Sequence, residues 1–235
     1  MPQSPTKKAQ QCLEPGVVPE ETRGTQRVDA MAPECSPVTA NTESPVEGTV
    51  VLRGNEYVLR RLRPDDEKRL QDFFYSHSQE TIQLRYGYMI STMTHERAYE
   101  LVNVDQQKDV ALGLFETSGK QEILHAVGRF YSEPEPHVAE VAFVVRESKR
   151  RCGMASVLLR RLAEIAQAGG MKKFAAQVLR ENEAMRSLFS RYSPEVSSLT
   201  GSIWLTYTFS IDTLLRKMGA SVPVARPRRL RPAKP

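Results

Sequence analysis

The chain contains, at residues 144–156, the stretch Val144-Val145-Arg146-Glu147-Ser148-Lys149-Arg150-Arg151-Cys152-Gly153-Met154-Ala155-Ser156. It leads from an apolar strand through a basic turn into a helix. Small residues at positions 153 and 155 let an anion approach the main chain closely, and the N–H groups of the first helical turn can hold it. The stretch therefore predicts a diphosphate-binding turn. A basic, solvated turn in which glycine serves only the backbone conformation is the alternative that the pattern leaves open.

Residues on both sides of this turn alternate between the periodicity of strands and that of helices. We expect strands at residues 57–62, 110–115, 123–131, 138–146 and 174–179, with one or two more within 196–211. We expect helices after Pro64, at residues 94–104, at residues 153–167 and at residues 181–192. This order predicts a single α/β domain with flanking helices and a mixed, mostly antiparallel sheet, in which a β-α-β crossover forms a parallel strand pair.

Composition divides the chain of 235 residues into three parts. Residues 1–48 are rich in proline and contain no Phe, Tyr or Trp, which predicts a disordered N-terminal arm. Residues 49–215 form the expected domain. Residues 216–235 contain seven Lys or Arg and no acid, which predicts a basic, flexible tail. The tail carries a charge of +7 and the arm one of −3, so the net charge of +5 leaves only +1 for the domain. Nucleic-acid binding by bulk charge is therefore disfavoured.

Other sequence features exclude several classes of protein. The three cysteines, Cys12, Cys35 and Cys152, form no even disulfide framework, which predicts a cytoplasmic location. No stretch is apolar and long enough for a membrane span, and the N-terminus does not resemble a secretory signal. The four histidines share no ligand spacing with each other or with the cysteines, so we expect no metal. We expect His77 and His125 to be structural, His95 to lie in a first helical turn and His137 in a loop.

Neither a Walker A loop nor a Rossmann G-x-G-x-x-G motif is present, which disfavours ATP and NAD. The spacing Arg150-x-x-Gly153-x-Ala155 instead resembles the R/Q-x-x-G-x-G/A signature of the GNAT acetyltransferases, which bind acetyl-CoA at this motif. The expected order of elements matches the GNAT order. Residues 178–185 resemble the segment that contains the family's CoA-facing asparagine, which is Asn182 here.

Within that family, roughly residues 55–192 are similar to the Pat-type protein lysine acetyltransferases, which modify acyl-CoA synthetases. The similarity consists of short matches in one sequence: Leu84-Arg85-Tyr86, Val104-Asp105, Ala126-Val127-Gly128, Ala139-Glu140 and the turn at 145–155. The resemblance implies a GNAT domain with a splayed parallel strand pair. It also implies acetyl-CoA as cosubstrate and a protein lysine as acceptor, with an acyl-CoA synthetase as a candidate partner.

The resemblance also implies roles for individual residues. An amine must lose a proton before it attacks a thioester, and free lysine, with a pKa of about 10.4, is protonated at pH 7. Glu140 occupies the position of the glutamate that is taken as general base in Pat-type enzymes. The residues alone leave open a structural carboxylate at a strand end, paired with Arg129 or Arg146.

The remaining expected contacts are with coenzyme A. The main chain of Phe143, Val144 and Val145 should pair with the pantetheine arm, and an N–H of Val144 or Val145 should stabilise the thioester oxygen. The diphosphate contacts are expected on Arg150, Arg151, Cys152, Gly153, Met154, Ala155 and Ser156. Asn182 has two equally supported roles, as a contact to coenzyme A or as the N-cap of its helix.

Two positions depart from the family pattern. Phe189 stands where many GNAT enzymes have a tyrosine that protonates the departing thiolate, and Ser193-Pro194 replaces a Gly-Phe pair. We therefore expect an acetyl-CoA-dependent N-acetyltransferase acting on an amine, with no general acid at position 189. A small-molecule amine acetyltransferase and a non-catalytic, acyl-CoA-binding regulatory module are the alternatives.

Overall fold

The computed structural model describes residues 46–87, 90–106, 108–118, 121–192 and 194–219. All of these residues belong to one compact unit. Its first strand begins at Val46 and its last helix ends at Met218, so regular elements extend into both the predicted arm and the predicted tail. The rest of the arm, including Cys12 and Cys35, and the tail beyond residue 219 lie outside the described residues.

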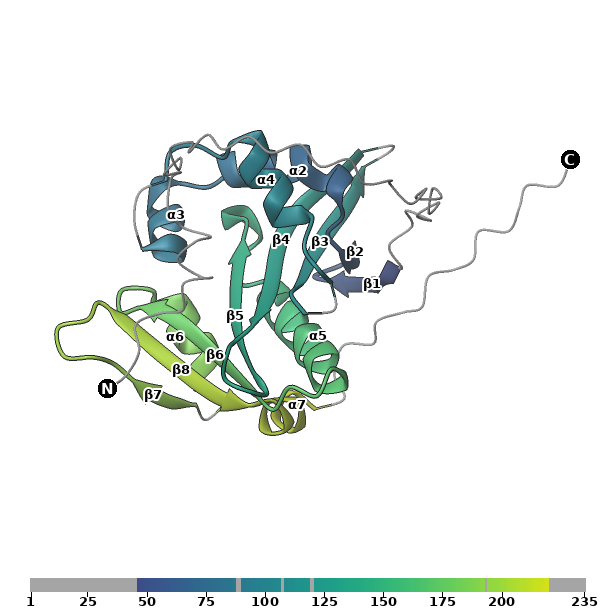
Figure 1. The fold of residues 1–235 in the computed structure, drawn as a ribbon. Coiled ribbons are helices and arrows are strands. Elements are labelled where there is room, and N and C mark those ends of the chain that lie inside the picture. Colours follow the sequence, from purple (N-terminus) through teal and green to yellow (C-terminus); the bar gives the residue numbers. More distant parts are fainter. Residues whose placement is uncertain (1–45, 88–89, 107, 119–120, 193, 220–235) are drawn as a thin grey trace, which may run out of the picture. The chain divides into compact units, whose positions relative to one another are not determined.

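The described strands form an eight-stranded sheet with the order β1-β2-β3-β4-β5-β6-β8-β7 (Figure 1). Their bounds are β1 Val46–Leu52, β2 Asn55–Arg61, β3 Val110–Ser118, β4 Gln121–Ser132, β5 Val138–Val145, β6 Lys173–Leu179, β7 Glu195–Ser197 and β8 Trp204–Ser210. Neighbouring strands are antiparallel except β5 and β6, which run parallel. The predicted α/β class, with one parallel pair in a mostly antiparallel sheet, is therefore confirmed.

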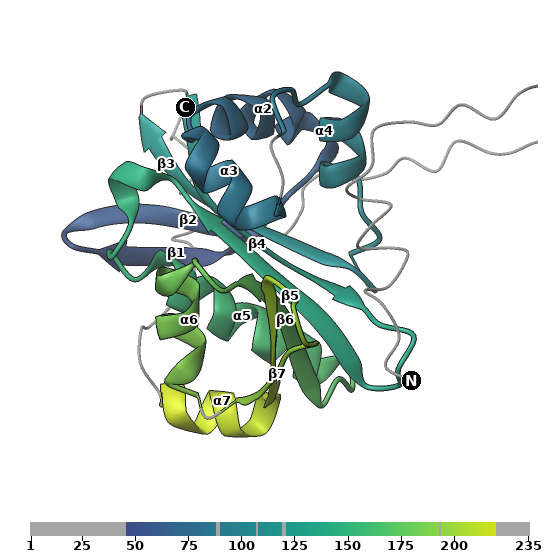
Figure 2. The same cartoon turned by 90° about the vertical axis from the view of Figure 1, so that its left-hand side faces the viewer.

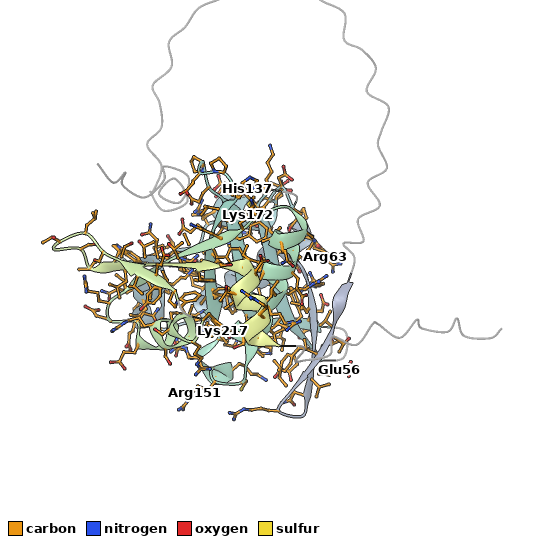
Figure 3. The ribbon with its side chains drawn as sticks, turned by 90° about the horizontal axis from the view of Figure 1, so that it is seen from below. Glu56, Arg63, His137, Arg151, Lys172 and Lys217 are labelled. Carbon is orange, nitrogen blue, oxygen red and sulfur yellow. The ribbon has the colours of Figure 1, made fainter. Side chains whose placement is uncertain are left out.

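Helices cover both faces of this sheet (Figure 2). On one face lie α2 Glu67–Tyr75, α3 Gln79–Tyr86 and α4 His95–Val102, and on the other lie α5 Met154–Ala168, α6 Glu183–Ser190 and α7 Ile211–Met218. Short 3-10 helices, η1 Pro64–Asp66 and η2 Glu147–Lys149, precede α2 and α5. The β1–β2 hairpin reaches the turn before α5, which Figure 3 shows near the labelled Arg151.

Helix α5 confirms the amphipathic pattern predicted for residues 153–167. Leu158, Leu162 and Ala166 recur at helical spacing and are buried among the side chains of the sheet. On the outer side, Arg160 pairs with Glu164 one turn away at 2.9 Å. The hydrophobic face of α5 therefore fixes the start of this helix against the sheet, and with it the turn that precedes it.

The sequence prediction missed β1, α3 and α7. Helix α3 has almost no apolar stripe, because only Thr81 and Ile82 of its residues are buried. Its signals lie at its ends. The hydroxyl of Ser78 accepts a hydrogen bond from the N–H of Thr81 at 3.2 Å, and Gly87 ends the helix in the left-handed conformation. Caps rather than periodicity would have identified this helix.

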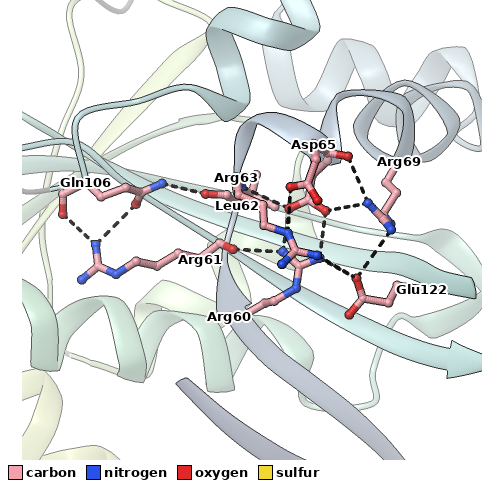
Figure 4. A network of polar contacts seen from close by, with 9 residues as sticks. Arg60, Arg61, Leu62, Arg63, Asp65, Arg69, Gln106 and Glu122 are labelled. Atoms are coloured by element: carbon pink, nitrogen blue, oxygen red, sulfur yellow. Dashed lines mark hydrogen bonds and ion pairs between the residues drawn. The ribbon is translucent and has the colours of Figure 1, made fainter. Parts of the chain in front are cut away.

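A network of buried charges joins β2 to the start of α2 and to β4 (Figure 4). The guanidinium of Arg60 donates to both carboxylate oxygens of Asp66, at 2.6 and 2.8 Å, and to Glu122 at 2.7 Å. It also lies 3.7 Å from the centre of the Phe115 ring. The side chain of Asp66 is fully buried and also accepts a hydrogen bond from the N–H of Arg63. This network fixes the angle at which the chain leaves β2 for α2.

Removing one partner of this pair should be far more costly than removing a surface pair. We expect Asp66→Ala to lower the free energy of unfolding by about 3 kcal/mol, because the buried Arg60 guanidinium loses both of its bonds to Asp66 and keeps only the partly exposed Glu122 as its partner. Lys68→Ala removes the exposed Lys68–Asp72 pair and should change the stability little. Urea denaturation followed by circular dichroism measures both, and equal effects of the two variants would contradict this assignment.

Candidate active site

The parallel pair β5–β6 is short, and its end opens the sheet. The two strands pair only at Val138 with Lys173, Ala139 with Phe174 and Glu140 with Ala175. Beyond Glu140, β5 continues to Val145 while pairing only with β4, and β6 continues to Leu179 while pairing with β8. The two strands diverge in Figure 1. The expected splay is therefore present, and the main chain of residues 141–145 faces the opening.

A cavity of about 750 Å³ lies at this opening. It is bounded by the end of β5, the turn before α5, the start of α5, and residues of α3 and α6. The sequence-predicted residues that line it are Phe143, Val144, Val145, Arg150, Arg151, Gly153, Met154, Ala155, Ser156 and Asn182. Glu140 and Cys152, which were also predicted, are not among its lining residues. Residues far apart in the chain are thus brought together around one space.

The turn presents main-chain donors to this cavity. Gly153 has a φ of 90° and is the N-cap of α5, with no side chain to cap the helix. The first hydrogen bond of this helix runs from the N–H of Val157 to the carbonyl of Gly153. The N–H groups of Met154, Ala155 and Ser156 therefore have no partner within the helix, and no other described residue bonds them. Unpartnered amides at the positive end of a 15-residue helix suit an anion.

Comparison with known proteins identifies this arrangement. Residues 68–192, more than half of the chain, match the model of the "Acetyltransferase (GNAT) family". The chain belongs to the GNAT acetyltransferase family. The fold of this family supports acetyl transfer to an amine, which agrees with the expected reaction class.

Solved structures share the fold of this GNAT domain. The GNAT domain of S. lividans PAT superposes with a TM-score of 0.62 at 26% identity, covering 69% of this chain and 95% of that chain. The ribosomal-protein-S5-alanine acetyltransferase from Vibrio fischeri gives 0.54 at 10% identity, with coverages of 66% and 93%. The PaiA N-acetyltransferase from Thermoplasma acidophilum, in complex with coenzyme A, gives 0.52 at 16% identity, with coverages of 65% and 97%.

Glu140 is the last residue of β5 that pairs with β6, so it lies where the splay begins. Burial raises the pKa of its carboxyl to about 7, and repulsion by Glu133 adds to this rise while attraction by Arg85 opposes it. The open alternative of a pair with Arg129 or Arg146 is not what the structure contains. Those guanidinium groups donate to the carbonyls of Leu101 and Leu124. The carboxyl of Glu140 therefore titrates near neutral pH.

Helix α3 forms a wall of the cavity and is bonded to the turn. The carboxylate of Glu147 accepts hydrogen bonds from the N–H and hydroxyl of Ser78, at 2.8 and 2.6 Å, and from the hydroxyl of Thr81 at 2.6 Å. These bonds lower the pKa of Glu147 to about 2. Arg150 also donates to the Thr81 hydroxyl, at 2.5 Å. Because α3 was missed in the sequence, its cavity-lining residues Thr81, Leu84 and Arg85 were not predicted as site residues.

Lys149, in the same basic turn, is bonded to the sheet. In the structure its Nζ donates to the hydroxyl of Tyr57 at 3.1 Å and to Glu116 at 3.0 Å. Glu116 also bonds Nε2 of His125 at 2.7 Å. Although Lys149 lines the cavity, its charge is balanced by Glu116, and it anchors the turn to the sheet.

Asn182 fulfils the capping role and also faces the cavity. Its Oδ1 accepts a hydrogen bond from the N–H of Met185 at 3.2 Å, as an N-cap does. Its Nδ2 donates to the carbonyl of Leu84 at 3.3 Å, which joins α6 to α3. The two alternatives for this residue are therefore compatible with each other.

Aromatic residues on α6 belong to the core rather than to the reaction centre. Phe189 is buried and packs against Phe143, Tyr207 and Phe209. Tyr192 is buried in the same cluster. Ser193 lies outside the described residues, and its neighbour Pro194 directly precedes β7. Phe189 has no group that could protonate a leaving group.

The histidines and cysteines of the described residues form no metal site. Nδ1 of His77 bonds the carbonyl of Phe73, and His125 is buried beside Tyr57. His95 lies in the first turn of α4 and His137 in the loop before β5. In the described part of the chain, no group of three or more His, Cys, Asp or Glu is placed to hold a metal ion. No helix there is both long and apolar enough to cross a bilayer.

The bonds between Glu147 and α3 predict a specific pH dependence of stability. Because folding lowers the pKa of Glu147 from 4.5 to about 2, its stabilising effect is present above pH 4.5 and is lost as the pH falls toward 2. We therefore expect Glu147→Gln to be less stable than the parent at pH 6 and to approach it near pH 2.5. Thermal unfolding between these pH values measures the difference. Glu56→Gln, at an exposed position of β2, is the control. A difference in stability between Glu147→Gln and the parent that does not change with pH would contradict the assignment.

Proposed function

We propose that this GNAT domain uses acetyl-CoA to acetylate an amine, and that the acceptor is a protein lysine. The observation that supports this best is a single cavity that joins the open edge of β5 to the amide-rich start of α5. Outside its lining, at the residue of β5 where the splay begins, lies the Glu140 carboxyl, whose pKa is near neutrality. Together they provide a place for the arm, the diphosphate and the reacting end of an acyl-coenzyme A.

The charge of the cavity supports an anionic cosubstrate. Its lining includes five cationic residues: Arg85, Lys149, Arg150, Arg151 and Arg191. No Asp or Glu is among the described residues that line it. A diphosphate near the unpartnered amides of Met154 to Ser156 would be stabilised by the helix dipole and by the arginines of this lining. The complex of the PaiA enzyme with coenzyme A, on the same fold, is consistent with this use of the cavity.

The apolar part of the cavity lining suits the pantetheine arm. Phe143, Met154, Met185 and Leu188 contribute apolar surface to the lining, and the main chain of β5 contributes hydrogen-bonding groups. An arm that contains two amides can pair with this edge as an additional strand does. Its thiol end would then point toward the splay, which begins after Glu140.

The reaction follows from this placement. Glu140 accepts a proton from the substrate ammonium, directly or through a water, and the free amine attacks the thioester carbonyl carbon. As the C–N bond forms, the N–H of Val144 or Val145 stabilises the negative charge on the carbonyl oxygen. The C–S bond then breaks, the nitrogen of the new amide loses its second proton to solvent, and the coenzyme A thiolate leaves. Since Phe189 cannot donate a proton, solvent protonates the thiolate, whose conjugate thiol has a pKa of about 8.5.

A protein acceptor is supported by the resemblance to Pat-type enzymes and by the surface of the β7–β8 hairpin. Val196, Leu199 and Ile203 are each more than half exposed there. Next to the loop of this hairpin, a Cβ added to Gly87 would lie 2.2 Å from the Trp204 ring, so the start of β8 packs closely against the end of α3. An exposed apolar group beside the cavity walls suits a protein surface better than a small amine.

Glu140→Gln tests the catalytic assignment. We expect kcat to fall by about 10²–10⁴-fold while the affinity for acetyl-CoA is unchanged, because the amide is neutral and cannot accept the proton. The parent's kcat/KM should rise with pH through about 7, where Glu140 loses its proton, and this inflection should disappear in the variant. Stopped-time assays of thiol release between pH 5.5 and 9 measure both, with Glu164→Gln, on the outer face of α5, as control.

Two outcomes would contradict the proposed function. If calorimetry detects no binding of acetyl-CoA to the parent protein, the cosubstrate assignment is wrong. If the parent binds acetyl-CoA but acetylates neither a protein lysine nor any small amine, the chain is a non-catalytic acyl-CoA-binding module instead.

The hairpin surface separates a protein acceptor from a small amine. We expect Leu199→Asp to raise KM for a protein substrate, for which an acyl-CoA synthetase is the first candidate, and to leave acetylation of a free amine unchanged. Val51→Asp, at an equally exposed position on β1, is the matched control. Mass spectrometry of acetylated lysines after incubation with acetyl-CoA gives the readout. Transfer to small amines alone would favour the small-molecule acetyltransferase.

A further inference from the structure

Two arginines from distant parts of the chain meet beside the turn before α5. Arg53 lies at the tip of the β1–β2 hairpin, and its Nη2 donates to the main-chain carbonyl of Arg151 at 3.0 Å. Figure 3 shows the labelled Arg151 on the side of the molecule where this hairpin ends. Both side chains are exposed, and Arg151 also lines the cavity. The hairpin therefore extends the cationic surface outward from the cavity.

The backbone at both arginines is strained. Arg53 has a φ of 50° and Arg151 a φ of 57°. These angles lie in the left-handed region, which residues other than Gly, Asn and Asp rarely adopt. Arg53 and Gly54 form the two-residue turn between β1 and β2, where Asn, Asp or Gly is the favoured first residue. An arginine at each of these positions costs conformational energy, and such strain is concentrated at functional sites.

These guanidinium groups also remain available for an anion. No described carboxylate forms an ion pair with Arg53 or Arg151. By contrast, the two preceding basic residues of the turn already have side-chain partners. Lys149 forms an ion pair with Glu116, and Arg150 donates a hydrogen bond to the hydroxyl of Thr81. The side chain of Glu56, on the adjacent strand β2, is exposed and forms no ion pair or hydrogen bond with a described residue.

We infer that Arg53 and Arg151 bind the 3′-phosphate on the adenosine of coenzyme A. This inference rests on the proposed function. If the diphosphate lies at the amides of residues 154–156 and the arm extends along β5 toward Glu140, the nucleotide leaves the cavity at the other end, beside Arg151. The 3′-phosphate is a monoester with a charge of about −1.5 to −2 at pH 7. The planar fork of arginine matches the oxygens of such a group.

The assignment predicts discrimination between coenzyme A and dephospho-coenzyme A, which lacks only the 3′-phosphate. We expect the parent protein to bind coenzyme A about tenfold or more tightly than dephospho-coenzyme A, as for hydrogen bonds to charged groups. Arg53→Gly and Arg151→Gly should each reduce this ratio by several-fold. Arg53→Gly should leave the affinity for dephospho-coenzyme A unchanged, whereas Arg151→Gly should also weaken it, because Arg151 lines the cavity that takes the diphosphate. Glycine accepts the positive φ, so these variants should fold.

Calorimetry with both ligands measures the ratio, and Arg191→Ala is the matched control. Arg191 lines the same cavity from the end of α6, and its replacement should weaken both ligands equally. An unchanged ratio in both glycine variants would overturn the inference, as would loss of the ratio in Arg191→Ala, which would place the phosphate at α6. Equal binding of the two ligands by the parent would also overturn it and would leave the proposed function intact. Failure of the parent to bind either ligand would overturn both.

Discussion

The end of strand pairing at Glu140 and Ala175 is the constraint on which the site depends. Up to this point β5 and β6 satisfy each other's main chains, and beyond it each strand pairs only with its other neighbour. A continuous sheet would have no opening for a ligand and no unpaired strand edge. The two strands are held apart by the elements that pack around the opening. Helix α5 packs beneath β5, and the turn before it is bonded to α3 through Glu147 and to the sheet through Lys149.

Much of the fold could be predicted because its signals are local. The alternation of apolar residues in β3, β4 and β5 and the stripe of α5 identified these elements within a few residues of their observed bounds. Helix α3 could not be found in this way, since it buries few side chains and is stabilised by its caps and by contacts with Glu147. Because α3 was not predicted, the wall of the cavity that it forms was not predicted either.

The site residues divide in the same manner. The turn at 150–156 was recognisable from its spacing, and ten of the predicted residues line one cavity. The surroundings of Glu140 were not recognisable, because Glu133 and Arg85 approach it from a loop and from α3. The partners of Lys149, Tyr57 on β2 and Glu116 on β3, are far from it in the sequence and could be identified only in three dimensions.

The contact between Gly87 and Trp204 has a consequence for the evolution of the acceptor side. Gly87 has a φ of 81°, and a methyl group there would overlap the indole ring. No side chain can be introduced at position 87 unless the tryptophan is first replaced by a smaller residue or displaced. Position 87 can therefore gain a side chain only together with a change at Trp204, so the end of α3 and the start of β8 are expected to vary together.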